Sequence, residues 1–242
     1  MNLVFDLGNT QFKVGIFEEN SLLSSYSISY DNIEELIAIT SSMKIDRIAL
    51  SSVKNIPNDL QEILNGYAKE VYYFNNNSIF PIDIEYKTPQ TLGHDRICNV
   101  IAAHSLYPDK DILVIDLGTC NKYDFITKEG KYIGGAISPG FKMRFDSMNH
   151  YTDQLPLLDP VISEQFIGDS TNNSMISGAY FGVIGEIKYF TKQYGSQFRD
   201  IEVLLTGGFA RHFEKALKNH IFAHPYLTLI GLNIILNFQE EK

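Results

Sequence analysis

The sequence predicts a mixed α/β protein built from two related domains, and three observations support this prediction. The chain has 242 residues, which is enough for two domains of about 120 residues each. The segment LVFDLGNT at 3–10 is echoed by LVIDLGT at 113–119, with a constant shift of 110 residues. Apolar runs of strand length alternate with helical patterns in both halves. We therefore expect a boundary near 108–110, with one domain over 1–109 and the other over 110–242.

The first half alternates strands and helices after an opening hairpin. Two apolar runs flank the turn after Asp6, which is typical of a β-hairpin. Asp31 is the expected N-cap of a helix, and Pro57 begins another. Strands are expected at 22–29, 47–51 and 71–74, a loop at 75–78, and helices over 31–40, after 57 and over 91–107.

The second half repeats the opening hairpin and continues with a long helix. The turn after Asp116 joins two apolar runs, as in the first half. Gly207 and Gly208 follow an apolar strand and are expected to open a helix. Strands are expected at 112–116, 121–127, 131–137 and 202–205, a turn at 138–140, and a helix around 172–194.

The composition restricts the partners of the protein. The chain carries 20 Lys and Arg against 29 Asp and Glu, a formal net charge of −9 at pH 7. This charge repels nucleic-acid backbones and anionic membrane surfaces at long range. It also opposes nucleotides, so a phosphate site must be built locally from backbone amides, a bound cation or a few basic side chains. We therefore expect neither nucleic acid nor a membrane as a partner.

The cysteines and the apolar segments predict a cytoplasmic location. Cys98 and Cys120 lack CxxC spacing, so neither a disulfide framework nor a zinc site is indicated. The longest apolar stretch, 226–238, is interrupted by polar residues and is shorter than the ~20 residues that span a bilayer. The N-terminus lacks the basic segment of a secretory signal.

The two repeated acids are candidate phosphate and metal residues. Asp6 and Asp116 each end a buried strand before a turn of small residues. Backbone amides of Gly8, Asn9 and Thr10 can contact phosphate oxygens, and a neighbouring carboxylate can hold hydrated Mg²⁺. The alternative is a tight hairpin whose aspartate only bonds its own turn. Two copies in the same frame favour the phosphate interpretation.

The segment Gly93-His94-Asp95-Arg96 opens an expected helix, whose dipole favours anions. Asp95 can accept a proton from a substrate hydroxyl, and Arg96 can hold a carboxylate or phosphate with two hydrogen bonds. The alternative is that Asp95 caps the helix while Arg96 forms a surface ion pair. His94 is more often a packing residue than a catalyst in such a position.

Two glycine-rich segments allow a close approach of the backbone. They are 134–140 (GGAISPG) and 206–208 (TGG), and either can also be a simple turn. The sequence contains neither GxxxxGK[ST] nor GxGxxG, so the two commonest nucleotide folds lack their fingerprints.

Taken in order, these motifs resemble those of the type III pantothenate kinase family. The resemblance also includes Tyr86-Lys87-Thr88-Pro89 and Thr171 ahead of Ser177-Gly178, and it covers nearly the whole chain. It implies two tandem ribonuclease-H-like domains of the actin-like ATPase and sugar-kinase superfamily, with the active site in the cleft between them. This fold agrees with the repeat of 110 residues.

The resemblance also implies roles for individual residues. Asp95 matches the proton acceptor for the primary hydroxyl of pantothenate, and the product is 4′-phosphopantothenate, which enters coenzyme A synthesis. Asp116 is implied to bind a monovalent cation, K⁺ or NH₄⁺, ATP is expected with Mg²⁺, and a homodimer completes the pantothenate site. The implied ATP contacts are Asp6, Leu7, Gly8, Asn9, Thr10, Gln11, Phe12, Lys13 and Thr119. The implied pantothenate contacts are Tyr86, Gly93, His94, Asp95, Arg96 and Thr171.

Lys122 departs from the pattern of the family that this chain resembles. Many members of that family carry small residues and threonines between this turn and the next acid, whereas here 120–123 (CNKY) precede Asp124. If Lys122 points inward, its ammonium can partly replace the monovalent cation, and activity becomes largely independent of potassium. If Lys122 points outward, which the period-two alternation of a strand also permits, it is a solvated residue. Thr88, where asparagine is frequent before Pro89, is a milder change.

Two alternative functions remain open from the sequence. A kinase fold can persist as a binding module, here a non-catalytic transcriptional accessory protein. The chain can also be a kinase for another small alcohol. The presence together of Asp6, Asp95, Arg96 and Asp116 favours an enzyme.

Overall fold

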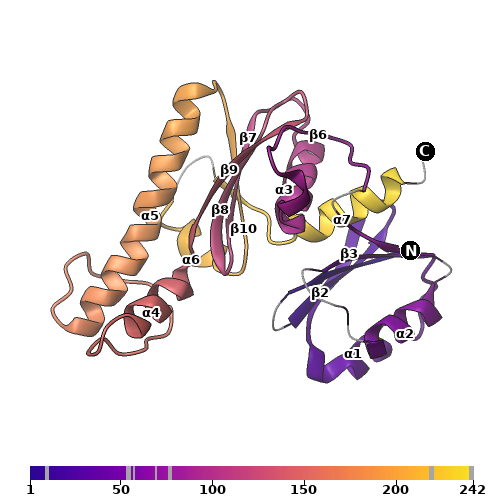
Figure 1. Cartoon of the computed structure of the whole chain (residues 1–242), viewed down its shortest axis with the longest axis horizontal. Coiled ribbons are helices and arrows are strands. Elements are labelled where there is room, and N and C mark those ends of the chain that lie inside the picture. The colour runs from indigo at the N-terminus through magenta and orange to yellow at the C-terminus, as the bar shows by residue number, and fades with distance from the viewer. Residues whose placement is uncertain are drawn as a thin grey trace. The chain divides into compact units, whose positions relative to one another are not determined.

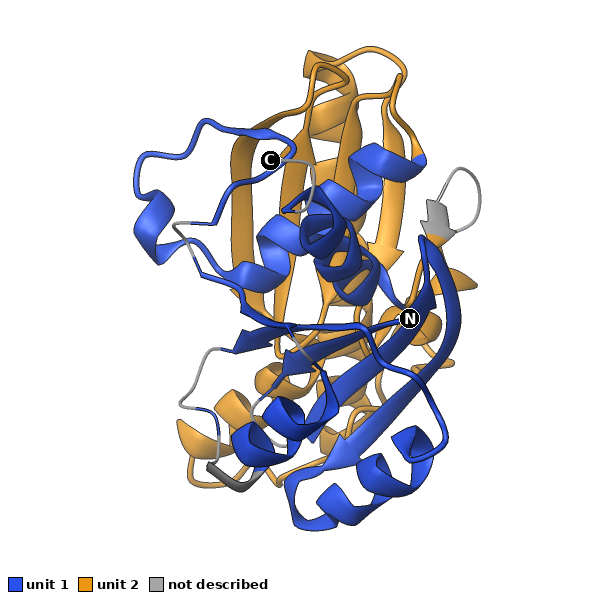
Figure 2. Ribbon diagram, turned by 90° about the vertical axis from the view of Figure 1, so that its right-hand side faces the viewer, with its two compact units in different colours: residues 1–106, 226–242 blue, residues 107–225 orange. Residues whose placement is uncertain are grey.

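The computed structural model describes residues 1–8, 11–52, 56, 58–68, 70–75, 78–217 and 221–239. The chain forms two compact units (Figure 2). The first contains Met1–Leu106 and Tyr226–Lys242, and the second contains Tyr107–Pro225. Each unit contains a β-sheet with helices, which confirms the expected mixed α/β class.

The sheet of the first unit has five strands in the order β3-β2-β1-β4-β5. Strands β1, β2 and β3 form an antiparallel meander, while β4 and β5 continue the sheet in parallel with β1. The strands of this sheet are β1 (Asn2–Leu7), β2 (Gln11–Glu18), β3 (Ser21–Ser29), β4 (Arg47–Ser52) and β5 (Glu70–Tyr73). The short strand β6 (Asp83–Ile84) belongs to the residues of this unit but not to this sheet.

The helices of the first unit cover its sheet. Leu36 of α1 and Leu60 and Leu64 of α2 are fully buried against side chains of β1 and β2, such as Phe5 and Phe12. This burial explains the apolar spacing on those helices. The helical segments are the 3-10 turn η1 (Tyr30–Asn32), α1 (Ile33–Thr40), α2 (Asn58–Tyr67), the 3-10 turn η2 (Pro89–Thr91), α3 (His94–Leu106) and α7 (Leu227–Phe238).

The C-terminal helix α7 packs in the first unit, so the compact units do not coincide with the expected halves 1–109 and 110–242. Asn2 Nδ2 donates to Asn233 Oδ1 at 2.8 Å, and Asn233 Nδ2 donates to the Glu19 carbonyl at 2.8 Å. A Cβ at Gly231 would lie 2.0 Å from the Cys98 carbonyl oxygen, so glycine allows α7 to approach α3 closely. Through these contacts the C-terminal helix packs against the N-terminal strands of the chain.

Five strands of the second unit repeat the topology of the first, in the order β9-β8-β7-β10-β11. Strands β7, β8 and β9 are antiparallel neighbours, and β10 and β11 run parallel to β7. The repeat at 3–10 and 113–119 thus marks the same strand and turn in each unit. The strands are β7 (Ile112–Leu117), β8 (Cys120–Ile126), β9 (Lys131–Pro139), β10 (Glu202–Thr206) and β11 (Ile221–Ala223).

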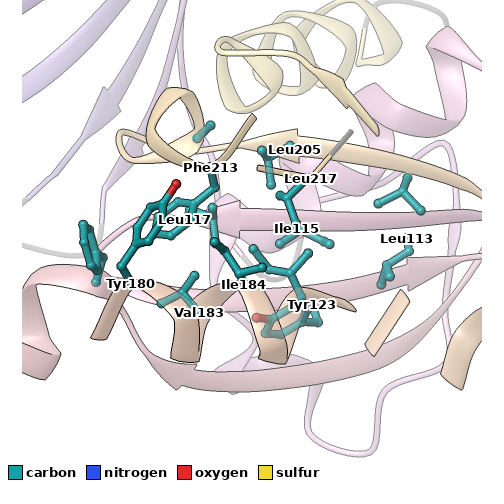
Figure 3. Close-up of a cluster of buried hydrophobic side chains, with 14 of the residues drawn as sticks. Leu113, Ile115, Leu117, Tyr123, Tyr180, Val183, Ile184, Leu205, Phe213 and Leu217 are labelled. Carbon is teal, nitrogen blue, oxygen red and sulfur yellow. The ribbon is translucent and has the colours of Figure 1, made fainter. Parts of the chain in front are cut away.

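The core of the second unit lies between its sheet and the long helix α5 (Figure 3). Alternate residues of β7, including Ile115 and Leu117, face Val183 and Ile184 of α5. Because strand side chains alternate, Asp116 points to the opposite face of the sheet. The helices of this unit are α4 (Phe141–His150), α5 (Thr171–Gln197) and α6 (Ala210–Glu214), labelled in Figure 1.

Most expected elements are confirmed; the errors lie at helix ends and in elements that the sequence did not predict, and Pro57 lies outside the described residues. The helix expected over 91–107 begins only at His94, after the separate turn η2. Asp31 is not a side-chain cap; instead Ser29 Oγ accepts the Asp31 N–H at 3.4 Å and starts a 3-10 turn. Helix α4 follows directly after β9, where only a turn was expected. Among the described residues, no helix is long and apolar enough to cross a bilayer.

Candidate functional site

The first hairpin places Asp6 at the end of a fully paired strand. Asp6 lies opposite Lys13 in the β1–β2 register, and the Gly8 N–H donates to the Gln11 carbonyl at 3.1 Å across the turn. A Cβ at Gly8 would lie 2.9 Å from that carbonyl, so a side chain there would crowd the turn. Asn9 and Thr10 lie outside the described residues.

The side chains expected near ATP in this hairpin divide into two groups. Leu7 and Phe12 are buried in the core, so only their backbone groups can contact a ligand. Asp6 and Lys13 are partly exposed and Gln11 is exposed. The polar side chains and the turn amides are therefore the parts of this segment suited to phosphate.

Tyr30 also belongs to this site, although no motif in the sequence pointed to it. Its hydroxyl donates to the Gly8 carbonyl at 2.9 Å and so holds the turn from the side. Burial raises the pKa of Tyr30, and the carboxylate of Asp6 raises it further. Tyr30 therefore stays protonated at neutral pH and remains a hydrogen-bond donor next to Asp6.

The start of α3 fixes the carboxylate of Asp95. Asp95 Oδ1 accepts the Arg96 N–H at 2.8 Å. A Cβ at Gly93 would lie 2.7 Å from the same oxygen, so a side chain at this position would displace the Asp95 carboxylate.

Arg96 and His94 are held by aromatic rings. The side chain of Arg96 is buried with 4% of the residue exposed, and its Cζ lies 5.6 Å from the centre of the Tyr86 ring. The His94 ring meets Phe74 edge-on at 4.6 Å. Burial lowers the pKa of His94, while Asp95 opposes this shift. Its Nδ1 has no hydrogen-bond partner within the described parts of the chain.

The buried thiol of Cys98 links the hairpin to the start of α3. Burial raises the pKa of Cys98 well above its usual range, and the carboxylates of Asp6 and Asp95 both add to the shift. Both carboxylates therefore lie within electrostatic range of one buried atom. Asp6 and Asp95, which are far apart in the sequence, thus both belong to the surroundings of Cys98.

The second hairpin holds an ion pair between Asp116 and Lys122, which occupy the register positions of Asp6 and Lys13 in the first. Asp116 lies opposite Lys122, and Lys122 Nζ is 2.8 Å from Asp116 Oδ2. The two side chains are only 16% and 11% exposed. Of the two orientations that the sequence allowed for Lys122, the structure shows the inward one, toward Asp116.

Two glycines allow the main chain to pack closely against the end of β7 and the turn that follows it. Gly207 has φ of +94°, and a Cβ there would lie 2.5 Å from Asp116 Oδ1. A Cβ at Gly140 would lie 2.2 Å from the carbonyl oxygen of Thr119, which sits exposed in the turn. The expected close approach at 134–140 and 206–208 is therefore observed, and it forms a cradle of main chain around Asp116 and Thr119.

A carboxylate network behind this cradle was missed by sequence reasoning. Glu186 of α5 accepts hydrogen bonds from Tyr123 at 2.7 Å and from Ser138 and Arg144. Burial alone would raise the pKa of Glu186, but the three donors together lower it. The network joins β8, β9, α4 and α5, so it supports the geometry around Gly140.

Thr171, the remaining expected substrate residue, is the first residue of α5 and is exposed. Ser170 caps this helix, because its Oγ accepts the Asn173 N–H at 3.3 Å. The helix terminus itself is thus satisfied by the chain, and the Thr171 hydroxyl is placed at the surface of the second unit.

The residues present fit Mg²⁺ without a preformed metal cage. Among the described residues, no group of three or more His, Cys, Asp or Glu could hold a metal ion. Mg²⁺ in kinases needs only one or two carboxylates, because it keeps several waters and binds phosphate oxygens. Asp6, at the end of β1 beside the turn amides, has this chemistry.

Comparisons with known proteins give the family and the fold. A sequence model of the family described as type III pantothenate kinase matches residues 2–193. A type III pantothenate kinase from Christiangramia forsetii is 40% identical over 246 aligned residues, covering 100% of both chains.

Two solved structures share the fold at low sequence identity. A candidate Baf family transcriptional activator from Campylobacter jejuni superposes with a TM-score of 0.65 at 20% identity, covering 99% of this chain and 100% of that one. A candidate 2-dehydro-3-deoxygalactonokinase from Sinorhizobium meliloti gives 0.57 at 11% identity, covering 99% of each chain. The architecture is therefore that of the actin-like and sugar-kinase ATPases, as expected.

Proposed function

The chain belongs to the type III pantothenate kinase family, and we propose that it transfers the γ-phosphoryl group of ATP to pantothenate. The product is 4′-phosphopantothenate, and the reaction is the first step of coenzyme A biosynthesis. The observation that carries this proposal is the pairing, in one unit, of the Asp6 hairpin with a fixed Asp95 carboxylate. Phosphoryl transfer needs a phosphate and metal site together with a base for the acceptor hydroxyl.

Asp95 is the proposed proton acceptor. Its Oδ1 is held by the Arg96 N–H, which fixes the direction of the carboxylate. As the primary hydroxyl of pantothenate attacks the γ-phosphorus, its proton passes to Asp95, and the bond to the ADP oxygen breaks. Such a positioned base contributes about 10²–10⁴-fold to the rate.

ATP and Mg²⁺ bind at the repeated turns. Mg²⁺, when bound, neutralises charge on the phosphates, and Asp6 is its proposed protein ligand. The turn amides and Lys13 contact phosphate oxygens, as does Thr119 in the second unit. The support is the crowding at Gly8 and Gly140, which keeps side chains away from the backbone at both turns. The full proposed set is Asp6, Leu7, Gly8, Asn9, Thr10, Gln11, Phe12, Lys13 and Thr119.

Pantothenate binds near the start of α3. The guanidinium of Arg96, already stacked on Tyr86, is suited to the carboxylate of pantothenate. His94 is neutral at pH 7 in this environment and offers Nδ1 as a hydrogen-bonding group. Gly93 and Thr171 complete the proposed contacts.

We also propose a homodimer and a cytoplasmic location. Exposed apolar side chains between α4 and the first turns of α5 support an interface, among them Tyr151, Leu157, Phe166 and Ile167. Cys98 and Cys120 are free thiols, which fits a reducing compartment. Light scattering of the purified protein tests the dimer, and a monomer at micromolar concentration would contradict it.

The test of the function is a coupled ADP-release assay with and without pantothenate. We expect ADP release that depends on pantothenate and is absent with a panel of sugars and other small alcohols. ADP release with another alcohol would support the broader kinase alternative. Absence of release with every acceptor would support a non-catalytic role.

A further inference from the structure

The buried pair of Lys122 and Asp116 occupies the place where the family resemblance implies K⁺ or NH₄⁺. Lys122 Nζ lies 2.8 Å from Asp116 Oδ2, and both side chains are mostly buried. A free monovalent cation does not fit this carboxylate as it stands, because Oδ2 already carries a full positive charge from the chain.

The backbone determines the position of the ammonium. Asp116 and Lys122 are direct cross-strand partners on β7 and β8, which places their side chains on the same face of the sheet. The other carboxylate oxygen, Oδ1, lies against Gly207, where a Cβ would come within 2.5 Å. One oxygen therefore meets Lys122 and the other is packed against main chain.

A fixed ammonium and a bound K⁺ have the same effect on charge. An isolated Asp116 carboxylate beside bound nucleotide phosphates would repel them, and the repulsion is strong where water is excluded. One positive charge at Oδ2 removes this repulsion. A lysine supplies that charge permanently, whereas a free ion must be recruited from solution.

We propose that Lys122 is a positioning residue that replaces a monovalent cation at Asp116, so that nucleotide binding does not depend on K⁺ or NH₄⁺. The proposal rests on the proposed function only for the identity of the nucleotide. The replacement of the cation at Asp116 can be measured without turnover, from the effect of K⁺ on Kd and Tm.

The first experiment compares the wild-type protein in potassium chloride and in choline chloride at equal ionic strength. We expect the Kd for a non-hydrolysable ATP analogue with Mg²⁺, and kcat where turnover occurs, to differ by less than about twofold. A loss of tenfold or more in choline, about the effect of one unscreened charge, would overturn the proposal.

The second experiment uses Lys122→Ala, which removes the ammonium and leaves room at the carboxylate. In choline we expect its Kd for the analogue to rise by about tenfold or more, and K⁺ or NH₄⁺ to restore most of the loss. Lys142→Ala is the matched control, because Lys142 pairs with Asp146 at 2.6 Å on the exposed face of α4. That variant should remain insensitive to the cation.

A third readout is independent of nucleotide. Because a ligand that binds only the folded state raises Tm, K⁺ should raise the Tm of Lys122→Ala at constant ionic strength but leave the wild type unchanged. If Lys122→Ala fails to fold, Lys122→Met replaces it. If neither variant folds, the wild-type comparison of potassium and choline decides. A variant with no cation response in Kd or Tm would overturn the proposal. A wild type that is inactive with pantothenate but indifferent to K⁺ in Kd and Tm would refute only the proposed function.

Discussion

The hairpins β1–β2 and β7–β8 have the same strand pairing, but the polar side chains at their turns have different surroundings. In the first, Asp6 is opposite Lys13 across the turn at 8–10; in the second, Asp116 is opposite Lys122 across the turn at 118–119. The second turn is one residue shorter, and its lysine forms a buried ion pair with the acid. Asp6 instead lies near Tyr30 and shares the surroundings of Cys98 with Asp95.

A repeated topology therefore does not carry the same polar chemistry in the two units. Both units place an acid at the end of the strand that has antiparallel and parallel neighbours. In the first unit Asp6 shares the surroundings of Cys98 with Asp95, whereas in the second unit Lys122 compensates the charge of Asp116 and Gly207 packs against its carboxylate. The following changes test this division of roles, starting with the largest expected effect.

Asp95→Asn should remove the base and retain the fold. We expect kcat to fall by about 10²-fold or more, since the amide cannot accept the hydroxyl proton. Steady-state ADP release measures the loss, with Asp109→Asn as a control at an exposed aspartate. A turnover within a few-fold of wild type would remove Asp95 from the mechanism.

Gly207→Ala should disturb the second hairpin far more than Gly208→Ala. The new Cβ would meet Asp116 Oδ1 at 2.5 Å on a residue with φ of +94°, whereas nothing lies within 4 Å of a Cβ at Gly208. We expect a loss of about 2–3 kcal/mol in the free energy of unfolding for Gly207→Ala and weaker ATP binding. Urea denaturation of the two variants makes the comparison, and equal midpoints would contradict the close approach.

Asn233→Leu should weaken the packing of α7 within the first unit and leave the second unit unchanged. It removes the acceptor of Asn2 Nδ2 and the donor to the Glu19 carbonyl, both at 2.8 Å. Asn2 Nδ2 keeps its second bond, to Asn237 Oδ1 at 2.9 Å, so we expect the free energy of unfolding to fall by only about 1 kcal/mol. Hydrogen exchange should increase in β1 and α7 but not in β7 and β8. A uniform increase over both units would show that the effect is not local.

Acidification should weaken the first unit slightly through His94 and His104. Burial lowers the folded-state pKa of both from the usual 6.5. The unfolded chain then binds more protons, so the free energy of unfolding falls as the pH drops through about 6.5, and is regained above it. We expect less than about 1 kcal/mol per histidine. Denaturant titrations at pH 7.5 and 5.5 measure the loss, which should shrink in the double variant to glutamine.

Much of the fold could be predicted because local patterns carry it. The echo of 110 residues locates β1 and β7, and strand alternation places Asp6 and Asp116 at their ends. The glycine at 93 marks the start of α3 one residue before the helix begins. These signals depend on neighbours in sequence, where periodicity and turn chemistry act.

The rest depends on contacts between distant residues. Helix α7 returns to β1 through Asn2 and Asn233, which are 231 positions apart. The Glu186 network joins residues of four elements, and no short motif announces it. The orientation of Lys122 followed only from the strand register, because a shift of one residue would have turned it outward.

The most direct test follows the phosphoryl group itself. ATP labelled at the γ-phosphorus is incubated with the protein, Mg²⁺ and pantothenate, and the products are separated and identified by mass. We predict label on the primary hydroxyl of pantothenate, in amounts equal to the ADP formed, and at least about 10²-fold less label with Asp95→Asn over the same time. Label that appears only as inorganic phosphate, or remains in ATP, would contradict it.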